Sequence, residues 1–371
     1  MKKSYFQFQA QQTQEFARHR EAEAEKETTR VRGRLFERVT LHPLDYAAVA
    51  MSLLNLKNRC DKTNNFPDDQ FSKLPDEILV SIVSLMPLKE ASQTSILSHR
   101  WRYLRTFTNG SLDFDCSALL NLLGIEKYCE KRKGWVNGVL RLHQGSTIDE
   151  LRACSVVSDK NFTLDIENWL SFLLRKKVKR FALECKGLRN CDYQQYTLTD
   201  QFLCNYGLDS LTVLCLTYVQ VTEKALLYVL SNCPFLEVLS VECLDSLQNL
   251  KPSGPLVGLR NVAISTSYYA HVARILLGNV PNLVEASYAG LYAFFLLRER
   301  DQMPSYLSLL ETLSLVLTWQ RISQFSRFPI LRNLRHLNLT LLVMDVKSLL
   351  GCTSLLVAFP ILHRFVVDLM G

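Results

Sequence analysis

The chain has 371 residues, of which 48% are hydrophobic and 21% are charged, and its formal net charge is +7. This composition is that of a globular protein and excludes wholesale disorder, and the modest positive charge does not by itself indicate nucleic-acid binding. The 11 cysteines are scattered without a CxxC pair, which favours free thiols in a reducing compartment, the cytoplasm or the nucleus, over disulfides.

Residues 1–66 differ from the rest of the chain. Gln7–Gln14 is rich in glutamine, and Glu21–Arg38 mixes acids and bases without an apolar face. The chain begins without the apolar stretch of a signal peptide, and no apolar run approaches the roughly 18 residues of a membrane span, so we expect no membrane association. We expect residues 1–66 to form a flexible or partly helical extension that ends in the polar linker Asp61–Gln70.

The next stretch, Phe71–Phe107, predicts three short helices. Pro75 stands at a first-turn position and is followed by two acidic residues, which suit the positive end of a helix dipole. Pro87 stops this helix and can begin a second one, and Ser98 is a suitable N-cap for a third. A unit of about forty residues buries too little surface to be stable alone. The pattern therefore predicts either a docking module or a helical cap on the chain that follows.

Three segments of this stretch carry a known motif in order: Leu74–Leu79 (LPDEIL), Pro87–Ala91 (PLKEA) and Thr94–Leu104 (TSILSHRWRYL). They resemble the F-box of the plant F-box/leucine-rich-repeat family, in its FBD-like subfamily with degenerate repeats. Gln93 and Arg105 depart from the residues common there, an arginine and a second tryptophan.

The resemblance implies binding to the Skp-type adaptor of an SCF-type cullin-RING ubiquitin ligase and, through the adaptor, to the cullin and the RING protein. It also implies which positions contact the adaptor. These matching positions are Leu74, Pro75, Ile78, Leu79, Ile82, Pro87, Leu97, Ser98 and Trp101.

Beyond residue 140 the pattern apolar-x-x-apolar-x-apolar recurs at steps between 23 and 33 residues, in or just above the leucine-rich-repeat range of about 20–29. Its nine occurrences begin at Ile148, Val178, Leu211, Leu236, Leu259, Leu283, Leu310, Leu334 and Leu362. Helical spacing separates several of them, at Ile166–Leu174, Thr222–Leu230, His271–Leu277 and Asp345–Leu350. The chain therefore predicts an α/β fold, a three-helix F-box followed by an irregular leucine-rich-repeat solenoid with a parallel sheet on the concave face and helices on the convex face.

Two features make the predicted solenoid irregular. The asparagine or cysteine that normally follows each strand is replaced, at Lys186, Val219, Leu244, Ser267, Leu291, Thr318 and Leu342. The last strand pattern, Leu362–Leu369, is followed by two residues only, so we expect a shortened array or a strand that a partner completes. The predicted domains are an extension at 1–66, the F-box at 67–110 and the repeat array at 111–371.

Motifs of catalysis and cofactor binding are absent from the sequence: it contains no GxGxxG, P-loop, GxSxG or HExxH pattern. The seven histidines are dispersed, and none has zinc-ligand spacing to a cysteine. We therefore expect a non-catalytic protein without cofactor or metal. The basic runs Lys127–Lys133 and Arg175–Arg180 lack interleaved aromatic residues, which favours solvated helix ends over a nucleic-acid site.

These observations favour a substrate-recognition subunit of a ubiquitin ligase, in which the F-box holds the adaptor and the repeats hold an unknown protein target. The target-facing residues are then expected at variable positions of the strands, among them Thr212, Cys215, Glu237, Ser240 and Arg335. Two alternatives remain open: a leucine-rich-repeat scaffold outside any ligase, with the F-box-like unit as its cap, and a co-receptor with a small molecule on the concave face.

Overall fold

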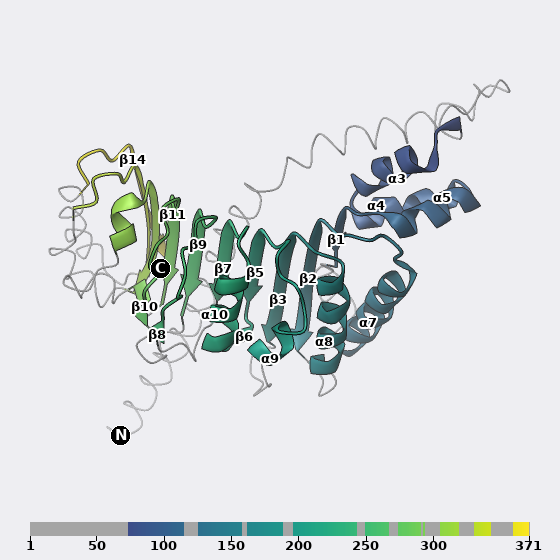
Figure 1. Cartoon of the computed structure of the whole chain (residues 1–371), viewed down its shortest axis with the longest axis horizontal. Helices are drawn as coiled ribbons and strands as arrows, with labels where there is room; N and C mark the ends of the chain where they lie inside the picture. Colours follow the sequence, from purple (N-terminus) through teal and green to yellow (C-terminus); the bar gives the residue numbers. More distant parts are fainter. Residues whose placement is uncertain are drawn as a thin grey trace, which may run out of the picture. The chain divides into compact units, whose positions relative to one another are not determined.

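The structure is a computed structural model that describes residues 73–114, 125–157, 162–187, 196–242, 249–266, 274–290, 292–293, 305–318, 330–342 and 359–370 (Figure 1). The predictions for residues 1–66, for the helix at Asp345–Leu350 and for Leu244, Ser267 and Leu291 lie outside these residues. The chain divides into two compact units between Gln220 and Val221, and each unit has its own set of parallel strands.

The first unit begins with the helices of the F-box-like stretch, which start where the prolines and the serine predict. Pro75 and Pro87 directly precede α3 and α4, and the Ser98 hydroxyl accepts a hydrogen bond from the Trp101 amide at 3.4 Å before α5. The elements are α3 (Asp76–Ser84), α4 (Leu88–Gln93), α5 (His99–Leu104) and the 3-10 turns η2 (Thr94–Ile96) and η3 (Arg105–Phe107).

Four strands of the first unit run parallel, in the order in which they occur along the chain. They are β1 (Ser111–Asp113), β2 (Glu150–Val157), β3 (Arg180–Gly187) and β5 (Val213–Thr217). Parallel neighbours need crossover connections, and two of these contain α7 (Ile125–Leu142) and α8 (Phe162–Arg175). In α8 the predicted apolar face is buried, since Ile166, Trp169 and Leu170 are at most 7% exposed. A short helix, α9 (Asp200–Leu203), precedes β5.

The second unit continues the same scheme with six parallel strands (Figure 1). They are β7 (Val238–Glu242), β9 (Asn261–Ser265), β11 (Glu285–Ala289), β12 (Thr312–Thr318), β13 (His336–Leu342) and β14 (Arg364–Met370). The pairing keeps the repeated apolar positions in step, so that Leu313, Leu337 and Phe365 lie side by side. All nine predicted strands are therefore confirmed, and with them the parallel α/β class.

Shorter elements complete the two units: β4 (Thr197–Leu198), β6 (Gln220–Val221), α10 (Glu223–Asn232), β8 (Asn249–Leu250), β10 (Arg274–Ile275) and η5 (Ser305–Leu309). Helix α10 confirms the predicted helix at Thr222–Leu230, and the Thr222 hydroxyl caps it by accepting from the Ala225 amide at 3.1 Å.

The helix predicted at His271–Leu277 is wrong for the residues that the structure describes. Arg274 and Ile275 form β10, which pairs in parallel with β8, and the Leu276 amide donates to the Leu250 carbonyl at 2.8 Å. A segment this short gains little from helical hydrogen bonds, whereas pairing satisfies the same backbone groups at once.

The repeats lack the asparagine that normally follows each strand and forms hydrogen bonds inside the array. Near the end of β11, buried hydroxyl groups form internal hydrogen bonds. The Tyr288 and Tyr306 hydroxyls lie 2.8 Å apart, and the Tyr292 amide donates to the Thr266 hydroxyl at 3.1 Å. Gly290 has a φ of 75°, and a Cβ there would meet the Thr266 carbonyl oxygen at 1.7 Å, so only glycine fits. Burial raises the pKa of all three tyrosines well above the ordinary value.

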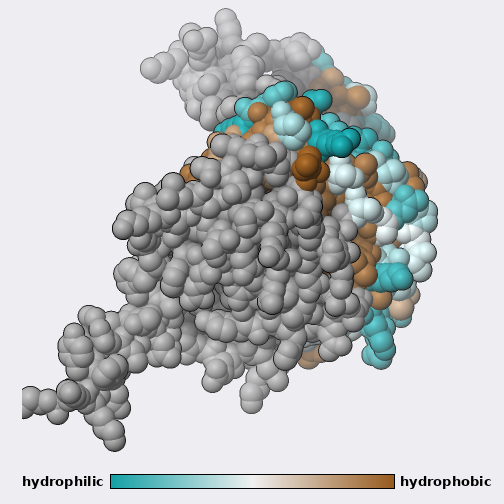
Figure 2. Space-filling model, turned by 90° about the vertical axis from the view of Figure 1, so that its left-hand side faces the viewer, coloured by the Kyte–Doolittle hydropathy of each residue, from teal (hydrophilic) through white to brown (hydrophobic). Residues whose placement is uncertain are grey.

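No helix in the part of the chain that the structure describes is long and apolar enough to cross a membrane. Hydrophobic and hydrophilic residues are interspersed over the described part of the face drawn in Figure 2.

Candidate functional site

The three helices before β1 build a small core of their own. Its buried residues are Leu79, Val83, Ala91, Trp101 and Leu104. Leu79 and Trp101, predicted to contact a partner, are 0% and 8% exposed, so they have almost no surface to offer. Both residues pack the helices against one another, because a unit this small must bury part of its apolar side chains in its own core.

The other predicted contact residues are accessible to different degrees. Ile78 is 48% exposed and Leu97 is 41% exposed, while Leu74 and Ile82 are half-buried against the core. Pro75, Pro87 and Ser98 are exposed. Leu85 and Tyr103, which the motif did not single out, are each 55% exposed. A helical unit of this size that leaves several large apolar side chains in solvent has the surface of a docking module.

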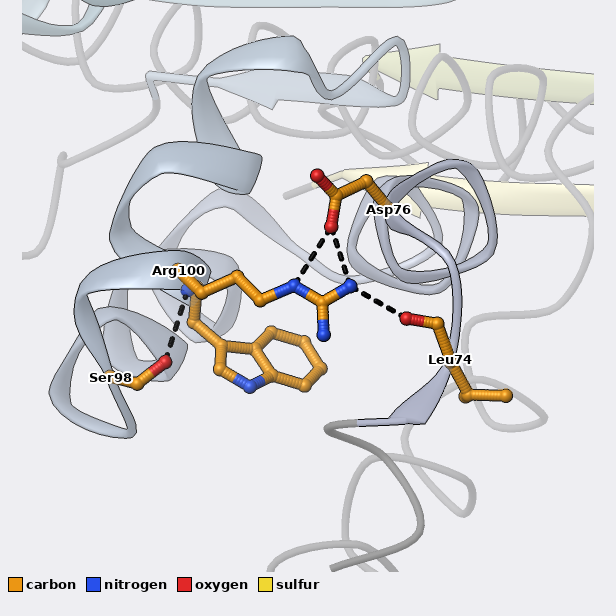
Figure 3. A network of polar contacts seen from close by, with 5 residues as sticks. Leu74, Asp76, Ser98 and Arg100 are labelled. Atoms are coloured by element: carbon orange, nitrogen blue, oxygen red, sulfur yellow. Dashed lines mark hydrogen bonds and ion pairs between the residues drawn. The ribbon is translucent and has the colours of Figure 1, made fainter.

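Arg100 ties the beginning of α3 to the beginning of α5 (Figure 3). Its Nε and Nη2 donate to the Asp76 carboxylate at 2.8 and 2.5 Å, and Nη2 also donates to the Leu74 carbonyl at 2.6 Å. Charge-assisted hydrogen bonds from one guanidinium to two acceptors fix both position and direction. Arg100 thereby holds the segment that carries Leu74 and Ile78 against the helix that follows Leu97. The motif contained this arginine, but its role was not predicted.

The end of this helical unit is joined by backbone hydrogen bonds to the residues that lead into β2. The Gln144 amide donates to the Thr106 carbonyl at 2.6 Å, and the Asp149 amide donates to the Asn109 carbonyl at 2.8 Å. At Gly110 a Cβ would lie 1.9 Å from the Ser84 carbonyl oxygen, so α3 and β1 approach closely there. These contacts join the helices and β1 and β2 in one packed unit.

His143 is buried at this junction and is 8% exposed. Its Nε2 lies 2.9 Å from the Thr108 carbonyl oxygen, and the Phe172 ring meets the imidazole edge-on with the ring centroids 6.0 Å apart. Desolvation lowers the pKa of His143, and the positive charge of Lys176 lowers it further, whereas the Thr108 carbonyl opposes the shift. Burial therefore favours the neutral form of the imidazole.

The residues predicted to face a target lie on both units. In the first unit Cys215 is half-buried in β5, and the Thr212 hydroxyl donates to the Lys179 carbonyl at 3.1 Å just before that strand. In the second unit Glu237 and Arg335 are exposed directly before β7 and β13. Ser240 is 3% exposed, so the expectation of a surface position there is not met. The apolar signature shows which residues face the core but not what covers the opposite face of a strand.

The described residues of the basic run Arg175–Arg180 make contacts within the protein. Lys179 lies 2.8 Å from the Asp149 carboxylate, Arg180 lies 3.2 Å from the Glu150 carboxylate, and Lys176 donates to the Gly145 carbonyl at 2.7 Å. Among the cysteines that the structure describes, Cys154, Cys185 and Cys233 are buried, Cys215 is half-buried and Cys204 is exposed. Within the described ranges no three His, Cys, Asp or Glu side chains come together as a metal site.

Comparisons with known proteins agree with this geometry. The F-box domain model matches residues 71–104. The Arabidopsis thaliana "Putative F-box/LRR-repeat protein At3g42770" is 32% identical over 45% of this chain, and "F-box/FBD/LRR-repeat protein At1g13570" is 31% identical over 48%. "Putative F-box/LRR-repeat protein At3g58880" of the same plant is 31% identical over 60% of this chain. The chain spans 35%, 45% and 53% of the length of these three relatives.

Proposed function

Because the chain belongs to the plant F-box/leucine-rich-repeat family, we propose that it is the substrate-recognition subunit of an SCF-type cullin-RING ubiquitin ligase. F-box proteins of this type generally act as substrate adaptors in such ligases, and the F-box generally binds the Skp-type adaptor. In this proposal the F-box of the chain binds that adaptor and the repeats bind a protein target.

The observation that carries the proposal is the exposed apolar surface of the F-box. Ile78 and Leu97 belong to the matched motif and remain 48% and 41% exposed, although the motif residues Leu79 and Trp101 are buried. Full burial of an exposed aliphatic side chain is worth about 1.5–3 kcal/mol, so covering the exposed half of each of these two stabilises a complex by roughly half of that, before the entropic cost of association. The half-buried Leu74 and Ile82 and the exposed Pro75, Pro87 and Ser98 extend the same contact.

The mechanism requires no bond chemistry from this chain. Binding the adaptor places a captured target beside the cullin and the RING protein, which bring a ubiquitin-charged enzyme to the target's lysines. Such tethering replaces a bimolecular encounter by an intramolecular one at an effective concentration of about millimolar or higher. The chain thus acts as a non-catalytic subunit, and we place it in the cytoplasm or the nucleus, where free thiols persist.

A scaffold whose F-box serves only as a cap is favoured by one observation, the junction with β1 and β2. That junction uses Thr106, Asn109 and Gly110, at the end of the helical unit. It does not use Ile78 or Leu97, which stay exposed in its presence. Capping therefore accounts for the buried end of the unit but leaves its exposed apolar side chains without a role.

The test is co-expression with a plant Skp-type adaptor, followed by capture and size-exclusion chromatography. We expect the wild-type chain to form a stoichiometric complex and the double variant Ile78→Asp with Leu97→Asp to lose affinity by about a hundredfold or more. The matched control is Leu164→Asp, which places the same charge on a 61% exposed leucine of α8. Failure of the wild-type chain to capture any member of an adaptor panel, or equal capture by the double variant, would refute the proposal.

A further inference from the structure

Each of the six strands of the second unit is preceded by the same kind of tight turn. In every turn the amide of a leucine donates to the carbonyl three residues earlier, at 3.2–3.4 Å. The donors and acceptors are Leu236 and Cys233, Leu259 and Leu256, Leu283 and Val280, Leu310 and Leu307, Leu334 and Leu331, and Leu362 and Phe359. The turns form a row along the edge of the sheet where the strands begin.

Neighbouring turns are joined directly at the end of the row that precedes β12, β13 and β14. The Asn333 side-chain amide donates to the Ser308 carbonyl at 2.8 Å, and the His363 amide donates to the Arg335 carbonyl at 2.8 Å. Since neighbouring strands lie about 4.8 Å apart, side chains of these three turns can be spanned by one short peptide segment.

This end of the row exposes apolar and basic side chains together. Ile330 is 64% exposed, and Leu309 and Ile361 are each 41% exposed. Arg332 and Arg364 are exposed, as is Arg335, whose side chain is 51% accessible. We call these six residues the rim patch: Leu309, Ile330, Arg332, Arg335, Ile361 and Arg364.

The rim patch has an excess of positive charge. Residues 305–312, 330–336 and 359–364 contain three arginines and one acidic residue, Glu311, which lies 3.9 Å from Arg335. The starts of β7 and β9 are balanced instead, since Glu237 there stands beside Arg260, whose amide donates to the Glu237 carbonyl at 2.9 Å. The charge excess is therefore local to the turns before β12, β13 and β14.

We propose that the rim patch binds a short acidic segment of a protein partner that also carries bulky apolar side chains. Arginine pairs with carboxylates through two parallel hydrogen bonds, so the three guanidinium groups complement such a segment in charge and in shape. Leu309, Ile330 and Ile361 supply apolar surface that the partner's side chains cover. The inference rests on the proposed function, because it states what kind of target segment the repeats accept.

Nucleic acid fits the rim patch less well than an acidic peptide. None of its six residues is aromatic, whereas binding of single strands relies on aromatic side chains that stack on bases. The three aliphatic side chains also find no apolar surface to cover on a phosphate backbone, whereas a peptide with bulky apolar residues supplies it.

The experiment is a peptide-display selection on the full chain purified with its adaptor, using random peptides of about twelve residues. The double variant Arg332→Glu with Arg335→Glu serves for counter-selection, and Lys224→Glu with Lys251→Glu, two exposed lysines of the second unit outside the rim patch, is the charge-matched control. We expect enriched peptides with at least two acidic and two bulky apolar residues. Their affinity should fall about tenfold or more in the rim variant, stay unchanged in the control, and weaken as salt rises.

Three outcomes overturn the inference: no enrichment that depends on the rim patch, enriched peptides without acidic residues, or equal affinity for the rim variant. Tighter binding of polyuridine or of anionic lipid vesicles than of the selected peptides also overturns it, in favour of those partners. If the double reversal unfolds the chain, the milder Arg332→Gln with Arg364→Gln variant replaces it. The Ile78→Asp with Leu97→Asp variant, purified without the adaptor, should still bind the selected peptides, so a failed adaptor interaction and a failed rim patch give different results.

Discussion

The F-box and the strand repeats use the same aliphatic side chains in opposite ways. In eight of the nine repeats the signature residues are buried, as with Leu239 at 0% and Leu337 at 1% exposure, and in the last repeat Leu362, Phe365 and Val367 are half-buried. In the F-box, motif residues of the same kind are divided, with Leu79 at 0% but Ile78 at 48% and Leu97 at 41%. A buried leucine contributes to the stability of the fold, whereas an exposed leucine in a defined motif is available to contact a partner.

The difference follows from size. A helical unit of about forty residues closes a core with a few side chains and has no second layer to cover the rest. In the repeats each described strand pairs in parallel with its neighbours, and most side chains at the signature positions are covered. Substitutions of exposed F-box residues should therefore change partner binding more than stability, and substitutions of buried repeat residues should do the reverse.

The largest effect on stability is expected for Leu337→Ala in β13. Leu337 pairs in register with Leu313 and Phe365, and its removal leaves a cavity that should lower the free energy of unfolding by about 2–5 kcal/mol. Ile78→Ala removes a half-exposed side chain and should cost under about 1 kcal/mol of stability, while weakening adaptor binding about tenfold. Urea unfolding and adaptor titration measure the two quantities. The reverse pattern, a large stability loss for Ile78→Ala with unchanged adaptor affinity, would contradict the distinction.

A smaller stability effect is expected for Tyr306→Phe, which tests whether the interior of the repeats also depends on polar contacts. The change removes one hydroxyl of a buried pair, so the Tyr288 hydroxyl loses its hydrogen bond to Tyr306. The free energy of unfolding, measured in urea, should fall by about 1–3 kcal/mol. The control is Tyr206→Phe, whose partly buried hydroxyl donates to Ser171 at 2.6 Å and should cost about 1 kcal/mol or less. Equal losses in both variants would show that burial of the pair is not what matters.

The same tyrosines predict the behaviour of the protein in alkali. Burial raises the pKa of Tyr288, Tyr292 and Tyr306, so the folded chain keeps their protons where the unfolded chain has lost them. The stability that they contribute is therefore complete below the ordinary pKa of about 10 and decreases as the pH rises above it. Tyr306→Phe should reduce this decrease.

Elements that follow from a local pattern of side chains could be predicted from the sequence. Contacts between residues far apart in the sequence could not. The nine strands followed from a six-residue signature, because alternate side chains of a strand share one face. The extent of helix α7 was not predicted, since Gly134 and Gly138 lower the helix propensity and the many charged residues interrupt the apolar face. Arg100 lies 24 residues from Asp76 in the sequence, and no periodic pattern reports such a contact. The burial of Ser240 was likewise beyond prediction, because it depends on what covers the strand.

A smaller effect again is expected for Arg100→Ala, and it should appear more in adaptor binding than in stability. Arg100 and Asp76 are 36% and 55% accessible at their side chains, so solvent screens the ion pair and its removal should cost about 1 kcal/mol or less. The lost contact to the Leu74 carbonyl frees the segment that carries Leu74 and Ile78, and adaptor affinity should fall about five- to tenfold.

Comparison variants separate positioning from charge. Arg100→Lys keeps the charge but loses the two-acceptor geometry, so it should recover only part of the affinity. Asp76→Asn keeps an acceptor for the guanidinium and should recover most of it. If Arg100→Ala slows association with the adaptor and leaves the dissociation rate unchanged, Arg100 acts by long-range attraction and not by positioning.

The smallest effect on stability is expected at His143, which lies at the junction between the F-box helices and the first strands. Burial lowers its pKa, so the unfolded chain binds a proton below the ordinary pKa of about 6.5 before the folded chain does. The stability that the neutral imidazole contributes is thus present above this pH and is lost as the pH falls below it. Urea unfolding at about pH 7.5 and pH 5.5 should show the loss in the wild-type chain.

His143→Gln removes the titrating group but keeps a side-chain amide that can donate to the Thr108 carbonyl, now 2.9 Å from Nε2. Its stability should therefore be lower than that of the wild type at neutral pH and approach it as the pH falls. Because the junction sits between the F-box and β1, adaptor binding should be insensitive to this change, as Ile78 and Leu97 take no part in the junction. A fall in adaptor affinity on acidification that His143→Gln abolishes would show instead that the core of the first unit controls the exposed surface of the F-box.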